Sequence, residues 1–370
     1  MKFRLIKTIQ AILTIALFTI TFSCQKGMKD DPASTRQGVG VDFAPKELKN
    51  FVQLNLVGDN GTTPNNDANL VNGWGITFSP SGTACVSSEG KGICTNYDFD
   101  GKSVGDVVSI PSAGASGIGH PTGQVYNPTP DFKLPNGNAA EMIFATADGT
   151  ISGWNQGNTA IKKIEKASAS YLGIAMMPDG NDWFLYVANF TQNKIDVYDK
   201  NWNAVSKPFT DPDLPAGYAP YNIAAVSDGK LYVTYAKKNA LGKAEFGSGN
   251  GYINVFSPTG TLLKRFASKG KLNAPWGITK APAGFWGEWS QISDLILVGN
   301  YGDGHISVFD ENGNSVGQLS AKGKPIEIEG LLGMTFPPVN GLNRYYLYFA
   351  SGPNNGNDGL VGYIKNYYIN

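Results

Sequence analysis

Aromatic and amide side chains gather around a short motif that recurs along the chain, as in NGWGITF at 72–78 and NAPWGIT at 273–279. If these segments meet in space, their side chains would line one binding mouth, because aromatic faces stack on apolar ligand surfaces while amides fix polar groups. The candidate ligand-binding residues are Asn72, Trp74, His120, Thr122, Tyr171, Tyr221, Asn222, Asn273, Trp276, Glu329 and Leu332, joined by Asn189 and Asn300 from turns that follow apolar strands. Two insertions, at 237–250 and 352–358, are expected to wall the same mouth.

Part of this set also offers hard oxygen ligands, which makes a calcium site the alternative chemistry. Asn72, Asn222, Asn273 and Glu329 would supply amide and carboxylate oxygens, the donor types that calcium prefers, as in a calcium-dependent lactonase-like hydrolase. One carboxylate balances little of the charge of a divalent ion, and an amide cannot act as a general base. We therefore expect no catalytic residues and no obligatory cofactor, and keep the calcium-dependent hydrolase as the alternative. A quinone cofactor is disfavoured, because the set lacks basic side chains.

The candidates also have a purely structural interpretation. Trp74 and Trp276 would then be wedges between neighbouring units, and Asn189 and Asn300 would cap turns through their own backbone. The chain has 2 histidines, so a histidine metal cluster cannot be built from them. A binding role therefore depends on the fold bringing these side chains together.

The spacing of the motif predicts the elements that position these residues. Its central residue recurs about fifty residues apart, which is typical of a propeller or a solenoid. Within each interval, apolar strands alternate with turns rich in Gly, Asn and Asp, and no segment has a helical period. The six copies are centred on Gly75, Gly123, Gly173, Asn222, Gly277 and Gly333. The sequence therefore predicts an all-β six-bladed β-propeller built from four-stranded antiparallel blades.

The last unit lacks an outer strand of its own. Strands around LLGMTF, YYLYFAS and GLVGYIKN use up the chain before Asn370. We expect FVQLNLV, residues 51–57, to return from the N-terminal side and close the ring, since closure protects the strand edges. The propeller domain would then span 51–370.

Bulk composition agrees with many short strands and argues against nucleic acid as a partner. The chain has 46 Gly and 21 Pro, with 12% aromatic and 16% charged residues. Thirty basic residues balance thirty acidic ones, counted as Lys+Arg 30 and Asp+Glu 30. Nothing in this balance resembles the basic footprint of a nucleic-acid binder.

The first residues have the pattern of an export signal. Lys2, Arg4 and Lys7 precede an uncharged apolar stretch from Ala11 to Phe22. Cys24 follows a small residue, as at the cleavage site of bacterial lipoproteins, although the position three places before it departs from the usual leucine and leaves a plain signal peptide as the alternative. We expect a signal peptide at 1–23, a polar tether at 24–50 and an outer-membrane lipoprotein, on the periplasmic or the cell-surface face, held through lipid on Cys24.

The two remaining cysteines flank the segment VSSEGKGI. A two-residue turn at Glu89 and Gly90 would place Cys85 and Cys94 directly opposite each other on antiparallel strands. A disulfide is compatible with this arrangement and with an oxidising compartment, and a pair of buried thiols is the other interpretation.

Several longer segments resemble an uncharacterised family of exported bacterial proteins, some of which carry a PEP-CTERM sorting tail. The resemblance runs from about residue 52 to 364 and includes DANLVNGWGITFSPSG at 67–82 and FTDPDLPAGYAPYNI at 209–223. It implies no activity. More loosely, the motif resembles NHL repeats, which form six-bladed propellers used mostly for binding. We therefore expect a binding or scaffold module for a glycan, a peptide or a partner protein.

Overall fold

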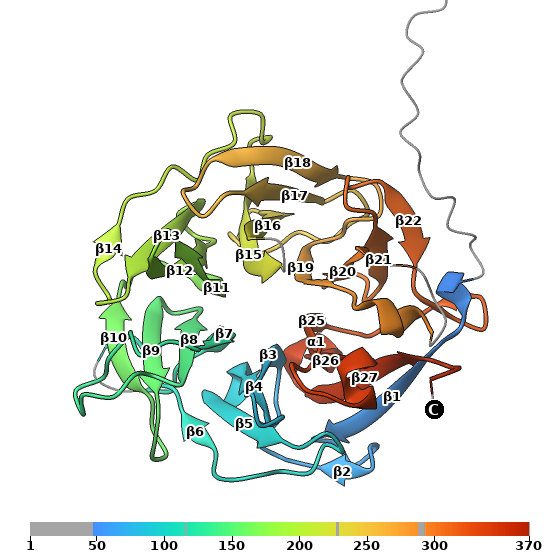
Figure 1. The fold of residues 1–370 in the computed structure, drawn as a ribbon, viewed down its shortest axis with the longest axis horizontal. Coiled ribbons are helices and arrows are strands. Elements are labelled where there is room, and N and C mark those ends of the chain that lie inside the picture. Colours follow the sequence, from blue (N-terminus) through green and yellow to red (C-terminus); the bar gives the residue numbers. More distant parts are fainter. Residues whose placement is uncertain (1–46, 115–116, 227–228, 288–291, 293, 370) are drawn as a thin grey trace, which may run out of the picture. The chain divides into compact units, whose positions relative to one another are not determined.

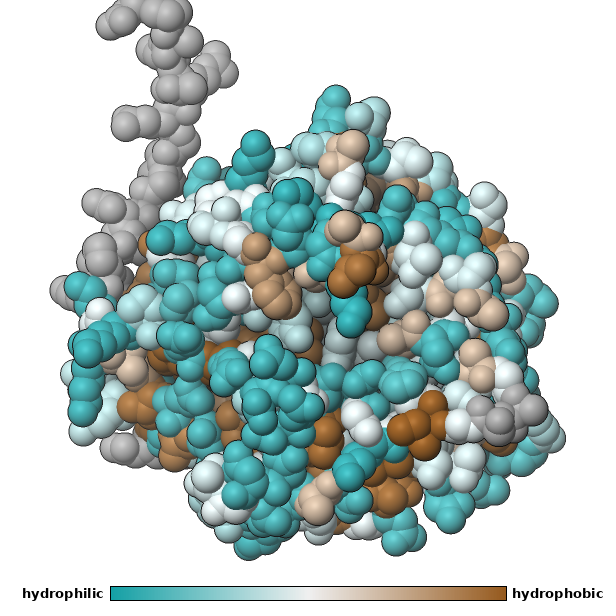
Figure 2. Space-filling model, turned by 180° about the vertical axis from the view of Figure 1, so that it is seen from behind, coloured by the Kyte–Doolittle hydropathy of each residue, from teal (hydrophilic) through white to brown (hydrophobic). Residues whose placement is uncertain are grey.

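The computed structural model describes residues 47–369 except 115–116, 227–228, 288–291 and 293. Six antiparallel sheets stand around a central axis, and the innermost strand of each sheet contacts the innermost strands of its two neighbours (Figure 1). The predicted six-bladed β-propeller is therefore confirmed. On the face drawn in Figure 2, hydrophilic residues predominate and hydrophobic ones form separate patches.

The first three blades follow the chain from the inside outwards. Blade 1 contains β3 (Gly73–Phe78), β4 (Ala84–Ser88), β5 (Ile93–Tyr97) and β6 (Val108–Ser109). Blade 2 contains β7 (Pro121–Tyr126), β8 (Met142–Thr146), β9 (Thr150–Trp154) and β10 (Ile161–Glu165). Blade 3 contains β11 (Tyr171–Asp179), β12 (Asp182–Asn189), β13 (Lys194–Asp199) and β14 (Ala204–Val205).

The last three blades follow the same plan, with additions at the end. Blade 4 contains β15 (Tyr218–Val226), β16 (Lys230–Lys237), β17 (Gly251–Phe256) and β18 (Leu262–Ser268). Blade 5 contains β19 (Pro275–Lys280), β20 (Ile296–Asn300), β21 (Ile306–Phe309) and β22 (Ser315–Gln318), followed by the hairpin β23 (Ser320–Ala321) and β24 (Lys324–Pro325). Blade 6 contains β25 (Leu331–Thr335), β26 (Leu347–Ser351), β27 (Leu360–Asn366), β1 (Phe51–Gly58) and the short β2 (Asn65–Asn66).

The recurring motif marks a bulge in every innermost strand. The register slips at the motif in all six inner strands, for example between Gly73 and Ile76 in β3. Neighbouring blades approach so closely here that a Cβ on Gly75 would lie 2.3 Å from Gln124 Oε1. A side chain at this position would therefore displace the next blade, which explains why glycine occupies five of the six positions. In blade 4, Asn222 replaces it and donates a hydrogen bond to the Trp276 carbonyl at 2.8 Å.

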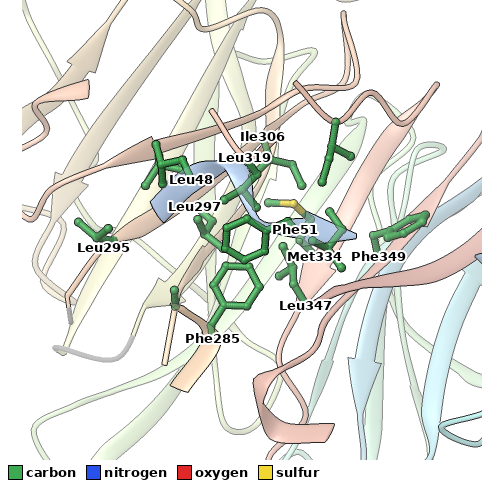
Figure 3. Close-up of a cluster of buried hydrophobic side chains, with 14 of the residues drawn as sticks. Leu48, Phe51, Phe285, Leu295, Leu297, Ile306, Leu319, Met334, Leu347 and Phe349 are labelled. Carbon is green, nitrogen blue, oxygen red and sulfur yellow. The ribbon is translucent and has the colours of Figure 1, made fainter. Parts of the chain in front are cut away.

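The N-terminal strand closes the ring as predicted. Strand β1 runs antiparallel to β27 from Phe51 opposite Asn366 to Gly58 opposite Leu360, and the two lie side by side in Figure 1. Figure 3 shows Phe51 against Phe285 in a buried cluster that also includes Leu48 and Met334. The ring centroids of Phe51 and Phe285 are 4.8 Å apart. Leu48, within the segment expected to be a tether, is therefore part of the packed core.

The predicted signal peptide and nearly all of the tether lie outside the described residues, including Cys24. Among the residues that the structure describes, no helix is long and apolar enough to cross a bilayer.

The two blade 1 cysteines are bonded, but not in the expected register. Cys85 lies opposite Asn96 and Cys94 opposite Ser87, so the cysteines are diagonal neighbours with Cα atoms 6.0 Å apart. The expectation of a directly opposed pair was wrong, because the connection is a 3-10 turn, η2 (Glu89–Lys91), rather than a two-residue turn. Both side chains are buried between blades 1 and 2.

Candidate functional site

One end of the channel is closed by side chains that precede the motif centre in different blades. Leu172, Tyr221, Trp276 and Leu332 are buried together, with Trp74 partly buried against them. The Trp74 and Trp276 rings meet edge to face with centroids 6.0 Å apart. We call this group the mouth cluster; its other members are Phe190, Ala219, Ala236 and Ala274, with Ala147, Ala244 and Tyr301 packed at its edge. Counting Ala147 of blade 2 at the edge, all six blades thus contribute side chains to an aromatic floor across the mouth.

Several predicted ligand-binding residues support this floor without being accessible. Tyr171 is fully buried between blades 2 and 3, where its hydroxyl pairs with Tyr198 at 2.7 Å and Asp196 at 3.1 Å. The prediction placed it in the mouth; however, alternate side chains of a strand face opposite ways, and Leu172 is the neighbour that joins the mouth cluster. Thr122 is also buried and donates to the Tyr171 carbonyl at 2.7 Å.

The predicted asparagines act mainly as braces for turns. Asn189 donates to Asp196 at 2.8 Å and accepts from the Gln192 backbone N–H at 3.2 Å. Asn300 accepts from the backbone N–H of Asn273, whose own side chain accepts from the Gly247 N–H at 2.7 Å. These contacts fit the turn-capping interpretation. Asn189, Asn273 and Asn300 are all buried.

The accessible polar part of the mouth centres on a residue absent from the predicted set. Glu89, at the start of η2, accepts from Asn72 Nδ2 through Oε2 at 2.7 Å, and its Oε1 lies 2.7 Å from His120 Nδ1. The side chains of Glu89 and His120 are 22% and 46% exposed. Segments 83–102 and 183–202 align without a gap, which places Glu89 level with Asn189. That alignment is the sequence signal by which it could have been found.

Both insertions reach this mouth. Phe246, in the 237–250 insertion, is 53% exposed, and its ring lies 5.1 Å from the ring of Tyr301 in an edge-to-face contact. Burial, together with the charge of Glu89, raises the pKa of Tyr301, so its phenol stays protonated. In the second insertion, the Asn354 N–H donates to Glu329 Oε1 at 2.9 Å. Phe246 and Tyr301 therefore form an aromatic wall at the mouth, and Tyr301 is close enough to Glu89 to be affected by its charge.

Two buried polar atoms near the mouth make no hydrogen bond within the described part of the chain. Asn72 Oδ1 and Trp74 Nε1 are buried and have no hydrogen-bond partner among the residues that the structure describes. Such groups are few in folded proteins, and they call for a specific explanation.

The oxygen atoms considered for calcium do not fit that ion. Asn222 Oδ1 accepts from the Ile223 N–H, Asn273 Oδ1 from the Gly247 N–H and Glu329 Oε1 from the Asn354 N–H. Asn72 Oδ1 is the one amide oxygen of this set without a partner among the described residues. Within the described ranges, no three His, Cys, Asp or Glu side chains lie close enough to hold a metal ion. We therefore derive no chemistry through calcium.

The rest of the channel, beyond the floor, is a separate neutral cavity. It has a volume of about 290 Å³, and strands of all six blades line it from Gly75 to Thr335, with Trp276 among its lining residues. A larger cavity of about 740 Å³ borders it and shares Thr279 and Thr335. These cavities lie beyond the motif glycines, away from Glu89 and His120.

The arrangement of the sheets defines the protein as a six-bladed β-propeller. The chain is 32% identical over 342 residues to the uncharacterised protein R648 of Acanthamoeba polyphaga mimivirus, covering 87% of this chain and 82% of R648. The uncharacterised protein L690 of the same virus is 33% identical over 314 residues, covering 80% of each. The protein belongs to the family of these uncharacterised viral proteins.

These relatives correct the sequence-based resemblance to exported bacterial proteins, since they come from a giant virus. No family model matches the chain. Among solved structures, a streptogramin B lyase has a TM-score of 0.50 and 14% identity, covering 85% of this chain and 97% of the lyase. At that identity the likeness shows the fold alone.

Proposed function

We propose that the protein is a carbohydrate-binding propeller whose ligand lies over the mouth cluster. The observation that carries this proposal is an exposed aromatic ring, Phe246, in edge-to-face contact with Tyr301, whose phenol is close enough to Glu89 to be affected by its charge. Glu89 itself is held in place by Asn72. A sugar ring has an apolar face that stacks on aromatic rings, and its hydroxyls donate hydrogen bonds to carboxylates.

A small ligand suits this mouth better than a peptide or a partner protein. Stable protein interfaces bury roughly 800 Å² on each partner and have an apolar centre. On the 237–250 insertion, Leu241 and Phe246 are the exposed large hydrophobic residues, and Ile118 is exposed two residues before His120. Three isolated side chains make a much smaller apolar surface than such a partner needs.

Calorimetric titration with a panel of neutral oligosaccharides tests the proposal. We expect Phe246→Ala to weaken binding about 2- to 10-fold, because a ring contact contributes about 0.5–1.5 kcal/mol. The matched control is Tyr368→Ala, since Tyr368 is 66% exposed near the C-terminal end and outside the mouth. Absence of binding to every oligosaccharide, or equal losses in both variants, would refute carbohydrate binding at this mouth.

We further propose that residues 1–23 direct export and that Cys24 carries lipid, which would anchor the protein to an outer membrane. Support comes from the three basic residues before the apolar stretch and from the small residue before Cys24. Labelling with radioactive palmitate in a bacterial host tests this. We expect label on the full chain and none on Cys24→Ala; a labelled variant would contradict lipidation at Cys24.

A further inference from the structure

We propose that His120 is a catalytic base that hydrolyses acyl esters of the bound carbohydrate, with Glu89 and Asn72 as its positioning residues. This inference rests on the carbohydrate-binding function proposed above. It concerns an activity that needs no metal ion.

The contact between His120 and Glu89 sets which imidazole nitrogen carries the proton. Glu89 Oε1 lies 2.7 Å from His120 Nδ1, and an ionised carboxylate can only accept, so the hydrogen is on Nδ1. In the neutral imidazole, Nε2 then carries the lone pair. A histidine base whose second nitrogen is held by a carboxylate is the arrangement found in Ser-His-Asp sites of acyl transfer. The side chain of His120 is nearly half exposed, so water and a ligand can reach it.

Glu89 is itself fixed by two bonds to Asn72. The Asn72 amide donates to Glu89 Oε2 at 2.7 Å, and the Glu89 backbone N–H donates to the Asn72 carbonyl at 3.1 Å. Asn72 has a φ of 52°, in the left-handed region, and its own N–H is bound to the Asp358 carbonyl at 3.0 Å. The carboxylate that orients His120 is therefore positioned by the backbone of blade 1 and by the 352–358 insertion. A surface ion pair would not need this support.

The reaction balances with water as the only co-reactant. His120 Nε2 takes a proton from water while the water oxygen bonds to the acyl carbon. The tetrahedral intermediate then breaks its bond to the sugar oxygen, which receives the proton from the imidazolium, giving a carboxylic acid and a free sugar hydroxyl. Tyr301, at the edge of the mouth cluster, offers a phenol hydroxyl as a hydrogen-bond donor.

Cleavage of an ester fits these residues better than cleavage of a glycosidic bond. Most glycosidases need two carboxyl groups that act directly on the sugar. Glu89 is bonded to Asn72 and His120 through its two oxygens; its remaining lone pairs can accept from a sugar hydroxyl, but an ionised carboxylate cannot be the acid that a glycosidase needs.

Acetate release from acetylated xylo-oligosaccharides, followed by proton NMR, tests the proposal. We expect His120→Gln to lower kcat about 100-fold or more, the usual contribution of a general base, while the affinity for the deacetylated oligosaccharide changes less than about twofold. The matched control is His305→Gln. His305 also stands beside a carboxylate, with its Nδ1 3.5 Å from Asp303 Oδ1, and it should keep full activity.

The outcomes separate this inference from the binding function. Oligosaccharide binding without acetate release in the wild type would overturn the catalytic role and leave the binding function standing. Absence of both oligosaccharide binding and acetate release would refute the binding function and the catalytic role together. Equal losses of kcat in the His120→Gln and His305→Gln variants would also overturn the assignment, because the two histidines differ in place and not in residue type.

Discussion

Two ion pairs in this propeller join similar groups in opposite surroundings. Asp211, on the connection between blades 3 and 4, binds Arg265 of β18 and Asn254 of β17, and its side chain is 3% exposed. Glu89 and His120 pair at the mouth with 22% and 46% of their side chains exposed. The first pair fastens a loop to a blade, and the second presents polar atoms to solvent. Exposure, rather than residue type, therefore separates a structural pair from a candidate site.

The comparison also explains the most distinctive motif in the sequence. FTDPDLPAGYAPYNI, at 209–223, contains Asp211 and leads into β15. Phe209 of the same segment packs against Tyr186 and Phe256, with ring centroids 5.6 Å and 5.2 Å away. The first part of this long motif thus fastens the connection between blades 3 and 4. Asp211 binds Arg265 there and is not a residue of the mouth.

The largest effect is expected from breaking the buried pair. Asp211→Ala leaves Arg265 without its partner in a site that excludes most water, so the free energy of unfolding should fall by about 3–5 kcal/mol. Urea unfolding measures this. The control is Glu245→Gln, which removes an exposed pair with Lys237 and should cost less than about 1 kcal/mol. Equal losses in the free energy of unfolding for the two variants would contradict the distinction between buried and exposed ion pairs.

An intermediate effect is expected from acid at the interface of blades 2 and 3. Burial alone would raise the pKa of Asp196, but hydrogen bonds from Asn189, Lys194 and Lys166 outweigh it and lower the pKa. A lowered folded-state pKa stabilises the fold above the ordinary Asp value of about 3.9, and that stability is lost as the pH falls through the folded-state pKa.

Unfolding by urea between pH 7 and pH 3 tests this pH dependence. The wild type should lose more stability across that range than Asp196→Asn, because the variant has no carboxylate to protonate at this site. Parallel curves for the two proteins would contradict a stabilising role of the Asp196 charge.

The smallest effect on stability is expected at the mouth. Glu89→Gln should change the free energy of unfolding by less than about 1 kcal/mol, because the side chain of its partner His120 is nearly half exposed to solvent. The same variant should weaken oligosaccharide binding, since an amide is a poorer acceptor than a carboxylate. A large loss of stability without a loss of binding would make the mouth pair structural, like Asp211 and Arg265.

Local pattern was enough to predict the blades but not the direction of single side chains. The motif at Gly75 and its copies marks a bulge that every blade needs, so the repeat is visible in the chain itself. Tyr171 and Leu172 are adjacent, and either side chain is apolar enough to pack in the mouth cluster or between blades 2 and 3. The alternation of side chains along the strand decides that Leu172 joins the mouth cluster. The register of Cys85 and Cys94 likewise depends on a 3-10 turn whose sequence also suits a tighter turn.

What the sequence by itself determined is the number of blades, their four-stranded plan and the closure by residues 51–57, because each repeat must cover the apolar faces of its neighbours. Only the tertiary structure decided which residues remain accessible at the mouth. Asn72 and Glu89 meet within blade 1, where Gly73 of β3 pairs with Ser88 of β4. His120 reaches Glu89 because blades 1 and 2 pack side by side. Contacts between blades depend on ring geometry, which no single repeat encodes.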